Sequence, residues 1–492
     1  MKDRTQVLVV GGGPAGATVA TLLARGGVEV TLAEREVFPR YHIGESLLPS
    51  CIKILDLMGM RDKLREFGFQ RKEGVYFEWG GPSWEARFLN LEGIDDKHSY
   101  QVSRAEFDQL LLEHAKSQGV AVHEGTAVKR VEFDGDRPVQ AVCMQDGEER
   151  TIGFDLLVDA TGRAGLMANR HQRDRVFHQA FRNVAVWGYW RGSGVLPTDL
   201  VGATGVCAVP DGWFWAIPLR DGTVSLGLVL HRDTFQAARG DSDDLRAFYL
   251  NAIAACPTIR DLVRDGALVS DLRVEQDYSY ASDRFAGPGY FISGDAACFL
   301  DPLLSTGVHL AQYSAVLAAA SICSVLRGEV SEQEARDFYH ASYRQAYLRF
   351  FTLVSCYYQQ YGGQRTYFWE AQQLTARDYH DTELNQAFLN IITGIEDFKD
   401  AAASEYVLGE MNQAHKEAFR VLRDPQKIAG LDPAEQERAK AKFELLDRTA
   451  HRFSLTEEAA VHGLYAVLEP QLGLARAVAA PLIAGRANGR LP

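Results

Sequence analysis

Three glycines near the start of the chain have the G-x-G-x-x-G spacing of a turn that binds phosphate groups. They follow the apolar run at residues 7–10, which predicts a strand buried on both faces, and precede a run at 17–23 that predicts a helix. Glycines here allow a sharp turn and close approach of the backbone to a pyrophosphate, which the helix N-terminus attracts. The residues expected to hold the pyrophosphate are Gly11, Gly13, Pro14, Ala15 and Gly16.

Glu34 ends the next predicted strand, at residues 28–32. A carboxylate at this position can accept hydrogen bonds from the ribose of a dinucleotide. The motif does not by itself distinguish NAD from FAD, and its other interpretation is a glycine-rich turn without a ligand.

Two tryptophans, Trp213 and Trp215, stand at alternate positions of a predicted strand that ends in Ile217 and Pro218. Side chains at i and i+2 of a strand share one face, so both indoles can line the same cavity. Taken alone, the pair favours the simpler interpretation of two core tryptophans.

Two further features favour FAD. Arg104 opens a predicted helix, and the apolar strand at 290–292 leads into Gly294 and Asp295. Together with the glycine-rich turn, these segments resemble the FAD-dependent aromatic monooxygenases and their relatives. The resemblance implies that Arg104 meets the FAD and that Asp295 holds its ribityl chain. The simpler alternatives are a surface salt bridge for Arg104 and a helix N-cap for Asp295.

The pattern W-x-W-x-I-P at 213–218 narrows the resemblance to the flavin-dependent halogenases. It implies that Trp213, Trp215, Ile217 and Pro218 shield the flavin, so that halide rather than an organic substrate takes the activated oxygen. The segment 69–74 resembles the family's F-x-x-K-x-G strand, which makes Lys72 the expected catalytic residue. Lys72 would carry the hypohalous species either as a haloamine or by hydrogen bonding, and burial would lower its pKa and ease both routes. A lone lysine in a strand is otherwise a solvated edge residue.

Ser305, Thr306 and Gly307 precede a predicted helix. Backbone N–H groups of Thr306 and Gly307 at a helix N-terminus would form a small anion site, where the resemblance places chloride or bromide. A Ser/Thr N-cap is the simpler interpretation, and both can hold together.

Leu304 stands where members of the family that act on indole carry a glutamate, which favours a phenol or a pyrrole. Segments 44–49, 278–280 and 294–299 resemble the subgroup that halogenates tyrosyl-type phenols, commonly presented on a peptidyl carrier protein in antibiotic biosynthesis. A second G-x-G-x-x-G for NAD(P)H is missing, so the resemblance also implies a separate flavin reductase that supplies FADH2. The rival hypotheses are an FAD-dependent aromatic hydroxylase, a pyrrole-acting halogenase and a non-catalytic binding module with a flavoprotein fold.

The elements that would position these residues indicate an α/β fold. Strand signals at 69–102, 120–158 and 183–230 alternate with the nucleotide-binding segments, and helical patterns follow residue 303. We expect a Rossmann-type FAD-binding domain with an interleaved β-sheet substrate layer at 1–330 and a C-terminal α-helical region at 331–492.

Composition excludes several other functions. The net charge of −13 leaves no basic excess for binding nucleic acid. The seven cysteines are scattered and never have C-x-x-C spacing, which predicts neither disulfides nor a metal site. An N-terminal signal sequence and a long unbroken apolar run are also missing from the pattern, so we expect a cytoplasmic protein without a membrane span.

Overall fold

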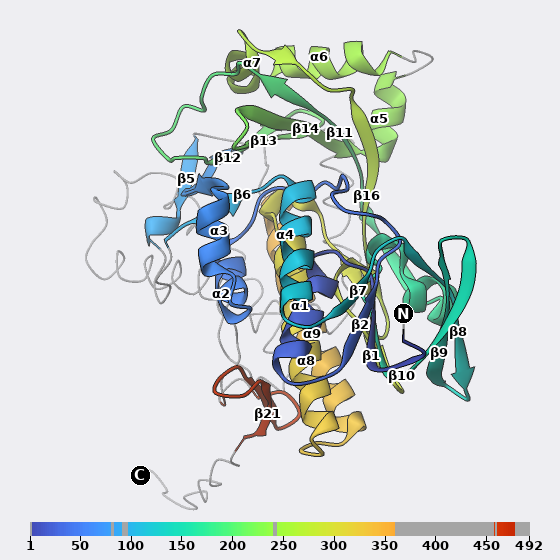
Figure 1. Cartoon of the computed structure of the whole chain (residues 1–492). Coiled ribbons are helices and arrows are strands. Elements are labelled where there is room, and N and C mark those ends of the chain that lie inside the picture. The colour runs from blue at the N-terminus through green and yellow to red at the C-terminus, as the bar shows by residue number, and fades with distance from the viewer. Residues whose placement is uncertain are drawn as a thin grey trace, which may run out of the picture.

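Two large β-sheets organise the chain in the computed structural model, which describes residues 2–79, 83–90, 97–239, 244–359, 457 and 460–477 (Figure 1). The first sheet has a parallel centre in which β1 lies between β10 and β2. Its strands in spatial order are β17 (Ala286–Gly287), β18 (Tyr290–Ile292), β10 (Glu148–Asp159), β1 (Arg4–Val10), β2 (Val30–Ala33) and β7 (Ala121–His123), with β9 (Arg137–Gln145) and β8 (Thr126–Asp134) attached to β10.

The apolar run of β1 is buried because the sheet is covered on both faces. Val7, Leu8 and Val9 are fully buried, as expected for a central parallel strand. Figure 1 shows four helices gathered on one side of the sheet, with β8 and β9 beyond the other side. These helices are α1 (Pro14–Arg25), α4 (Arg104–Ser117), α8 (Gly307–Leu326) and α9 (Glu332–Gln359).

The second sheet is mostly antiparallel and lies beside the first. Its order is β19 (Cys298–Phe299), β16 (Arg273–Ser282), β11 (Arg175–Arg191), β14 (Thr223–His231), β13 (Gly212–Pro218), β12 (Thr204–Val209), β4 (Gly74–Glu78) and β5 (Trp84–Arg87), with β15 (Ala267–Leu268) paired to β11. One face carries the helices α5 (Arg232–Arg239), α6 (Leu245–Ala255) and α7 (Pro257–Val263). The other face looks toward the first sheet, so the predicted interleaved α/β fold is confirmed.

Strand β13 shows how alternation divides its side chains. Phe214 and Ala216 belong to the core under α5–α7, whereas Trp213, Trp215 and Ile217 belong to the core shared with the first sheet. The period of two therefore turns both indoles toward the space between the sheets.

Shorter elements pack beside the sheets: α2 (Pro49–Leu57) against α8, α3 (Arg61–Phe67) against α2, and the pair β3 (Gln70–Lys72) with β6 (Ser99–Gln101). Among the described residues past α9, the expected helical pattern is wrong at 464–476. There β20 (Leu464–Val467) and β21 (Gly473–Arg476) form a hairpin against α8. Leu464 and Ala466 are buried at alternate positions, a period of two that the apolar composition conceals. The helices expected between residue 361 and this hairpin lie outside the described residues.

Helix α9 packs on α8 and donates hydrogen bonds into the first sheet. The Tyr339 hydroxyl donates to the Ile292 carbonyl at 2.7 Å, and the Tyr343 hydroxyl to that of Gly294 at 3.2 Å. Helix α9, the first element of the region 331–492, is thus packed against the first sheet, and the boundary at 330 stays a prediction.

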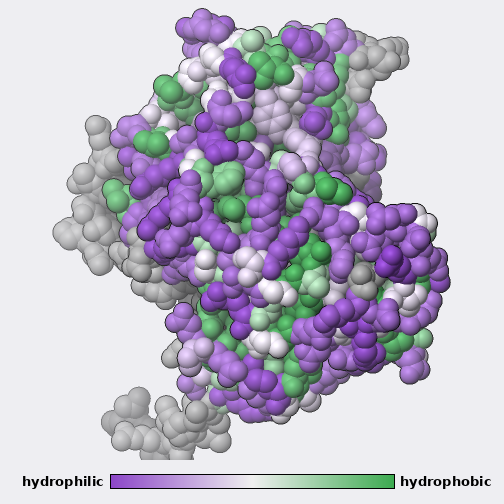
Figure 2. Space-filling view, viewed as in Figure 1, coloured by the Kyte–Doolittle hydropathy of each residue, from purple (hydrophilic) through white to green (hydrophobic). Residues whose placement is uncertain are grey.

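Helix α8 is, among the described helices, the one long and apolar enough to cross a membrane, and 94% of its most apolar window is buried inside the protein. Its apolar surface is therefore used by the core. The face in Figure 2 is mostly hydrophilic, with apolar side chains in small separate patches. The cysteines whose side chains the structure describes are buried and form no disulfide.

Candidate active site

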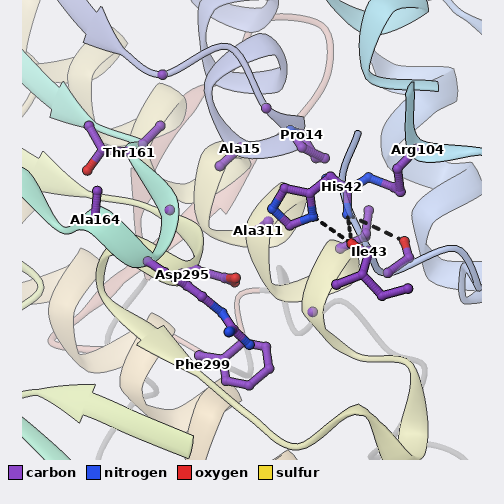
Figure 3. A pocket seen from close by; sticks show the side chains of 18 of the residues that line it. Pro14, Ala15, His42, Ile43, Arg104, Thr161, Ala164, Asp295, Phe299 and Ala311 are labelled. Atoms are coloured by element: carbon purple, nitrogen blue, oxygen red, sulfur yellow. Dashed lines mark hydrogen bonds between the residues drawn. The ribbon is translucent and has the colours of Figure 1, made fainter. Parts of the chain in front are cut away.

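A cavity of about 660 Å³ lies between the two sheets, a volume suited to a cofactor. Both sheets and the loops 35–46 and 293–308 contribute to its lining. Figure 3 shows Arg104 with His42 and Ile43 on one side of the pocket and Asp295 with Phe299 on the other. The cavity thus collects residues that are up to about 300 positions apart in the sequence.

The glycine-rich turn has the geometry that its sequence predicts. Gly11 has a φ of +106°, and a Cβ there would stand 2.2 Å from the Ala160 carbonyl oxygen. A Cβ on Gly16 would stand 1.8 Å from the Gly11 carbonyl oxygen, so neither position accepts a larger residue. A Cβ on Gly13 would meet only the end of Arg40, at 3.4 Å. Gly13 is thus open toward the cavity, where a phosphate needs close access to the backbone.

The N-terminus of α1 is available to a ligand. The helix begins at Pro14, and in the described structure no side chain caps it at Gly13. Pro14 and Ala15 line the cavity beside Gly11 and Gly13. The N–H groups and the helix dipole can therefore act on an anion in the cavity, which fits a pyrophosphate.

Glu34 is buried at the end of β2 and lines the cavity. Its carboxylate accepts hydrogen bonds from the Gly12 amide at 2.5 Å and the Glu36 amide at 2.9 Å. A carboxylate has about four acceptor positions, so two remain for ribose hydroxyls. The backbone bonds fix the orientation that such a role requires.

Arg104 begins α4 and is buried rather than a surface residue. Its guanidinium donates two hydrogen bonds to Asp108, at 2.8 and 2.9 Å, and a third at 2.8 Å to the Ile43 carbonyl. Arg40 also pairs with Asp108, at 2.8 Å. Arg104 therefore holds the loop 40–44 against the cavity, and the contact with FAD stays a prediction.

Asp295 follows β18 and points into the cavity opposite Arg104 (Figure 3). The N-cap of the 3₁₀ turn Gly294–Ala296 is Ser293, and Asp295 lies within the turn, so Asp295 is not an N-cap. Burial raises the pKa of Asp295, and the cations of Arg163, Arg104 and Arg175 oppose that rise. An acceptor placed in this way fits hydroxyl groups of a ligand such as the ribityl chain of FAD.

Trp213 and Trp215 form one wall of the cavity, with ring centroids 6.3 Å apart. Trp213 is 1% and Trp215 6% exposed. Ile217 also lines the cavity, whereas Pro218 ends the strand outside the lining. The sequence analysis missed Trp187 of β11, whose ring lies 6.1 Å from that of Trp215 and extends the wall. No motif marks it, because only the pairing of β11 with β14 places it there.

Lys72 is fully buried on β3, so the solvated-edge alternative is wrong. Its Nζ donates to the Ser46 hydroxyl at 2.7 Å and to the Leu47 carbonyl at 3.1 Å, and lies 5.4 Å from the Phe88 ring centroid. Among the described residues, no carboxylate forms an ion pair with it. Burial lowers the pKa of Lys72 from 10.5 to about 7. Ser46 lines the cavity, so the Ser46 hydroxyl lies between the cavity and the Nζ atom of Lys72.

The loop before α8 contains the residues predicted to bind halide. Ser305 has a φ of +56°, and α8 begins at Gly307. Thr306 is buried at the N-cap position, but its hydroxyl makes no capping bond and has no hydrogen-bond partner in the described structure. Thr306 and Gly307 line the cavity, and a Cβ on Gly307 would meet nothing within 4 Å.

A hydrogen-bonded network connects this loop to the tryptophan wall. The Trp213 indole donates to the Tyr358 hydroxyl at 2.8 Å, and that hydroxyl donates to Asp301 at 2.9 Å. Asn183 donates to the same carboxylate at 2.7 Å. Burial raises the pKa of Asp301 from 3.8 to about 6.

Glu45 is a second buried carboxylate that the sequence analysis did not single out for chemistry. It is 3% exposed and lines the cavity, and its Oε1 accepts from the Tyr189 hydroxyl at 2.8 Å. Burial raises the pKa of Glu45 from 4.5 to about 7. In the described part of the chain, no three His, Cys, Asp or Glu residues are grouped as metal ligands.

Comparison with known proteins identifies the family. The family model described as "Tryptophan halogenase" matches residues 6–95 and 91–422. The tryptophan 2-halogenase of Chondromyces crocatus is 42% identical over 97% of this chain and 95% of its own length. The sulochrin halogenase gedL of Aspergillus terreus is 34% identical over 89% of this chain and 85% of its own.

Solved structures agree. The myxobacterial chondrochloren halogenase CndH, described as a variant of FAD-dependent halogenases, is 35% identical, with a TM-score of 0.72 over 82% of this chain and 92% of its own. The flavin-dependent halogenase CmlS is 31% identical, with a TM-score of 0.71 over 85% of this chain and 79% of its own. The cavity, the glycine-rich turn and these matches lead to one conclusion: this chain is an enzyme of the flavin-dependent halogenase family, which uses FAD and halide in natural-product biosynthesis.

Proposed function

We propose that this enzyme halogenates an electron-rich aromatic ring, a tyrosyl-type phenol that a peptidyl carrier protein can present. The observation that carries the proposal is the position of Lys72, fully buried and one hydroxyl group behind the wall of the cavity. A lysine with a pKa near 7 is partly a neutral amine at physiological pH, and partly a hydrogen-bond donor. Either form can hold an electrophilic halogen species away from water.

The residues proposed to hold FAD are Gly11, Gly13, Pro14, Ala15, Gly16, Glu34, Arg104 and Asp295. When bound as FADH2, the cofactor supplies the activation of O2 that converts halide into a hypohalous species. Members of the family generally receive reduced flavin from a separate reductase. We propose the same arrangement here, with NAD(P)H as the source of electrons and the cytoplasm as the compartment.

The indoles of Trp213 and Trp215, with Ile217, would exclude the organic substrate from the flavin side of the cavity. Pro218 would contribute only by ending β13. Thr306 and Gly307 would bind the halide, because the buried Thr306 hydroxyl has a hydrogen to donate and α8 directs its N-terminus to the same place. With these roles, the loop before α8 would bind the halide and the rest of the cavity would hold the cofactor.

The choice of a phenol depends on Leu304, a half-buried apolar side chain where indole-acting members carry a carboxylate. A phenol activates its own ring and does not need that group. The rival is an indole substrate, supported by the relative named tryptophan 2-halogenase. A pyrrole substrate and hydroxylation of the ring are the further alternatives.

Mass spectrometry separates these hypotheses. The enzyme is incubated with a flavin reductase, NADH, FAD and either chloride or bromide, and is offered tyrosyl carrier protein, free tyrosine, free tryptophan and a pyrrole. The proposal expects the halogen mass on tyrosyl carrier protein first. Halogenation of tryptophan alone would refute the phenol, and a mass gain of oxygen that is independent of halide would refute halogenation.

The substitution Lys72→Ala tests the residue itself. Oxidation of FADH2 should continue while halogenated product disappears, because the lysine acts after the halide has been oxidised. Lys116→Ala is the matched control, since Lys116 is an exposed residue paired with Glu124 at 2.6 Å. Halogenation retained in Lys72→Ala would remove the lysine from the mechanism.

A further inference from the structure

A row of hydrogen bonds joins a buried carboxylate in the cavity wall to Tyr41, an exposed residue that also lines the cavity. Glu45 Oε1 accepts from the Tyr189 hydroxyl at 2.8 Å, and the Tyr189 hydroxyl lies 3.0 Å from that of Tyr41. Tyr41 is 40% exposed, whereas Glu45 is 3% exposed. Three side chains thus connect a buried carboxylate with solvent.

The direction of these hydrogen bonds follows from their donors. The indole N–H of Trp187 can only donate, and it bonds the Tyr41 oxygen at 2.7 Å. With its oxygen engaged in this way, Tyr41 has its own O–H to donate to Tyr189, and Tyr189 donates in turn to Glu45. Every O–H in the row therefore points toward Glu45, which is the arrangement that delivers protons inward.

The reaction of the family requires such delivery. In balanced form, Ar–H, halide, O2, FADH2 and one proton give Ar–X, FAD and two molecules of water. Reduced flavin supplies two electrons and the halide, as it is oxidised to the hypohalous level, supplies two more, and these four electrons reduce O2 to water. The additional proton must come from solvent, and Glu45, at 3% exposed, is connected to an exposed side chain through its hydrogen bond with Tyr189.

We infer that Glu45, Tyr189 and Tyr41 form a proton relay that carries protons from solvent to the flavin cavity. In one transfer the proton of Tyr189 passes to Glu45 Oε1, that of Tyr41 passes to Tyr189, and Tyr41 takes a proton from water. Each tyrosine oxygen loses one O–H bond as it gains another, and the Glu45 carboxylate gains one and becomes a carboxylic acid. Release of that proton into the cavity restores the carboxylate. The relay depends on the family's reaction and not on the identity of the aromatic substrate.

The surroundings of Glu45 favour proton transfer along its hydrogen bond with Tyr189 over a purely structural role for that bond. Its second oxygen, Oε2, is buried, and the Ser225 hydroxyl is near enough to the carboxylate to lower its pKa. A structural role would need one acceptor, and a glutamine would serve it equally well. Lys72 bonds to the adjacent residue Ser46 and forms no ion pair with Glu45.

The charges around the relay keep Glu45 able both to accept and to release a proton. Burial is the largest influence and raises the pKa of Glu45 to about 7, with a further small rise from Asp221 before β14. The Ser225 and Tyr189 hydroxyls and the Arg104 guanidinium oppose that rise. Arg273 lies over the Tyr41 ring, 3.7 Å from its centroid, at the solvent end. Burial raises the pKa of both tyrosines above 10, so neither is a tyrosinate at neutral pH.

Infrared difference spectroscopy on the protein without FAD tests the relay independently of turnover. Over about pH 5 to 9, the wild type should show a carboxylic acid band that titrates near pH 7 and is missing in Glu45→Gln. Tyr189→Phe should move the midpoint to higher pH, because it removes a hydrogen bond that favours the ionised form. Tyr249→Phe is the matched control, since it removes another buried hydroxyl, bonded to the Leu226 carbonyl in the core under α5–α7.

The second measurement is halide-dependent product formation from chemically reduced FAD. Tyr189→Phe and Tyr41→Phe should lower the rate at least about tenfold at alkaline pH, with a smaller loss at acid pH and a larger solvent deuterium effect. Tyr249→Phe should change none of these. Tyr41→Phe lies at the surface and keeps the test valid if Glu45→Gln does not fold.

Unchanged rates across the pH range in both tyrosine variants, or a Glu45 band that is insensitive to Tyr189, would overturn the relay. A wild-type enzyme that halogenates tryptophan instead of a phenol would refute the proposed substrate and leave both arms of this test intact.

Discussion

Lys72→Met should make the pH dependence of stability flatter than that of the wild type. Methionine fills a similar volume without a charge, so the variant loses the titration of a buried amine. In the wild type the lysine has a pKa of about 7 when folded and 10.5 as its ordinary value. Between these limits the unfolded chain binds more protons than the folded one, so stability rises with pH across this window.

The size of the effect follows from the shift. Well below pH 7 the buried lysine costs about 5 kcal/mol relative to an unshifted one, at about 1.4 kcal/mol per pKa unit. At about pH 9 roughly 2 kcal/mol of that cost remains, because the folded form is then neutral and the unfolded form still mostly charged. From about pH 6 to about pH 9, the free energy of unfolding of the wild type should therefore rise by about 3 kcal/mol relative to that of the variant.

Urea denaturation of the protein without FAD measures this difference, since bound cofactor would add its own stabilisation. The hydrogen bonds of Lys72 to Ser46 and Leu47 are lost in the variant at every pH, so comparison of the two pH values removes their contribution. A wild-type-to-variant difference that stays constant from about pH 6 to 9 would show that Lys72 remains protonated throughout, and the neutral amine would have to be abandoned.

Four further substitutions test other parts of the cavity. Gly13→Ala should fold with normal thermal stability but bind FAD at least about tenfold more weakly, measured by FAD fluorescence quenching. Gly16→Ala should fail to fold, because its Cβ would overlap the Gly11 carbonyl, and thermal unfolding distinguishes it from Gly13→Ala. Gly307→Ala should leave stability unchanged and raise KM for bromide more than for chloride, because the added methyl occupies open space beside the proposed anion site. If the KM values of the variant for both halides equal those of the wild type, Gly307 does not belong to that site. Trp215→Ala should lower the halogenated product formed per FADH2 oxidised by about tenfold, measured by mass spectrometry against NADH consumption, and an unchanged ratio would contradict the shielding role.

The parts of the site that the sequence predicts are those decided by local backbone geometry. Gly11 and Gly16 are fixed by a turn in which any Cβ would collide with the neighbouring backbone. The shared face of Trp213 and Trp215 follows from the period of a strand. In both cases the residue type and its spacing contain the structural information.

Contacts between distant segments could not be predicted in this way. Tyr189 is 144 residues from Glu45, and nothing in either local sequence indicates that they meet. The sequence marked Arg104 as a contact of FAD; its bond to Asp108 lies within α4, but its bond to the Ile43 carbonyl depends on the packing of α4 against a loop. The hairpin at 464–476 was mistaken for helix because an apolar run without clear alternation fits both.

The hydroxyl of Tyr358 has consequences for how this enzyme can change over evolution. This hydroxyl accepts a hydrogen bond from the Trp213 indole and donates one to Asp301. The tryptophan wall and the loop proposed to bind the halide are therefore both held by the same residue of α9. A mutation near the end of α9 that adapts the enzyme to a new aromatic compound would also disturb its preference between chlorine and bromine. Substrate range and halogen choice are therefore expected to be inherited together in variants of this chain.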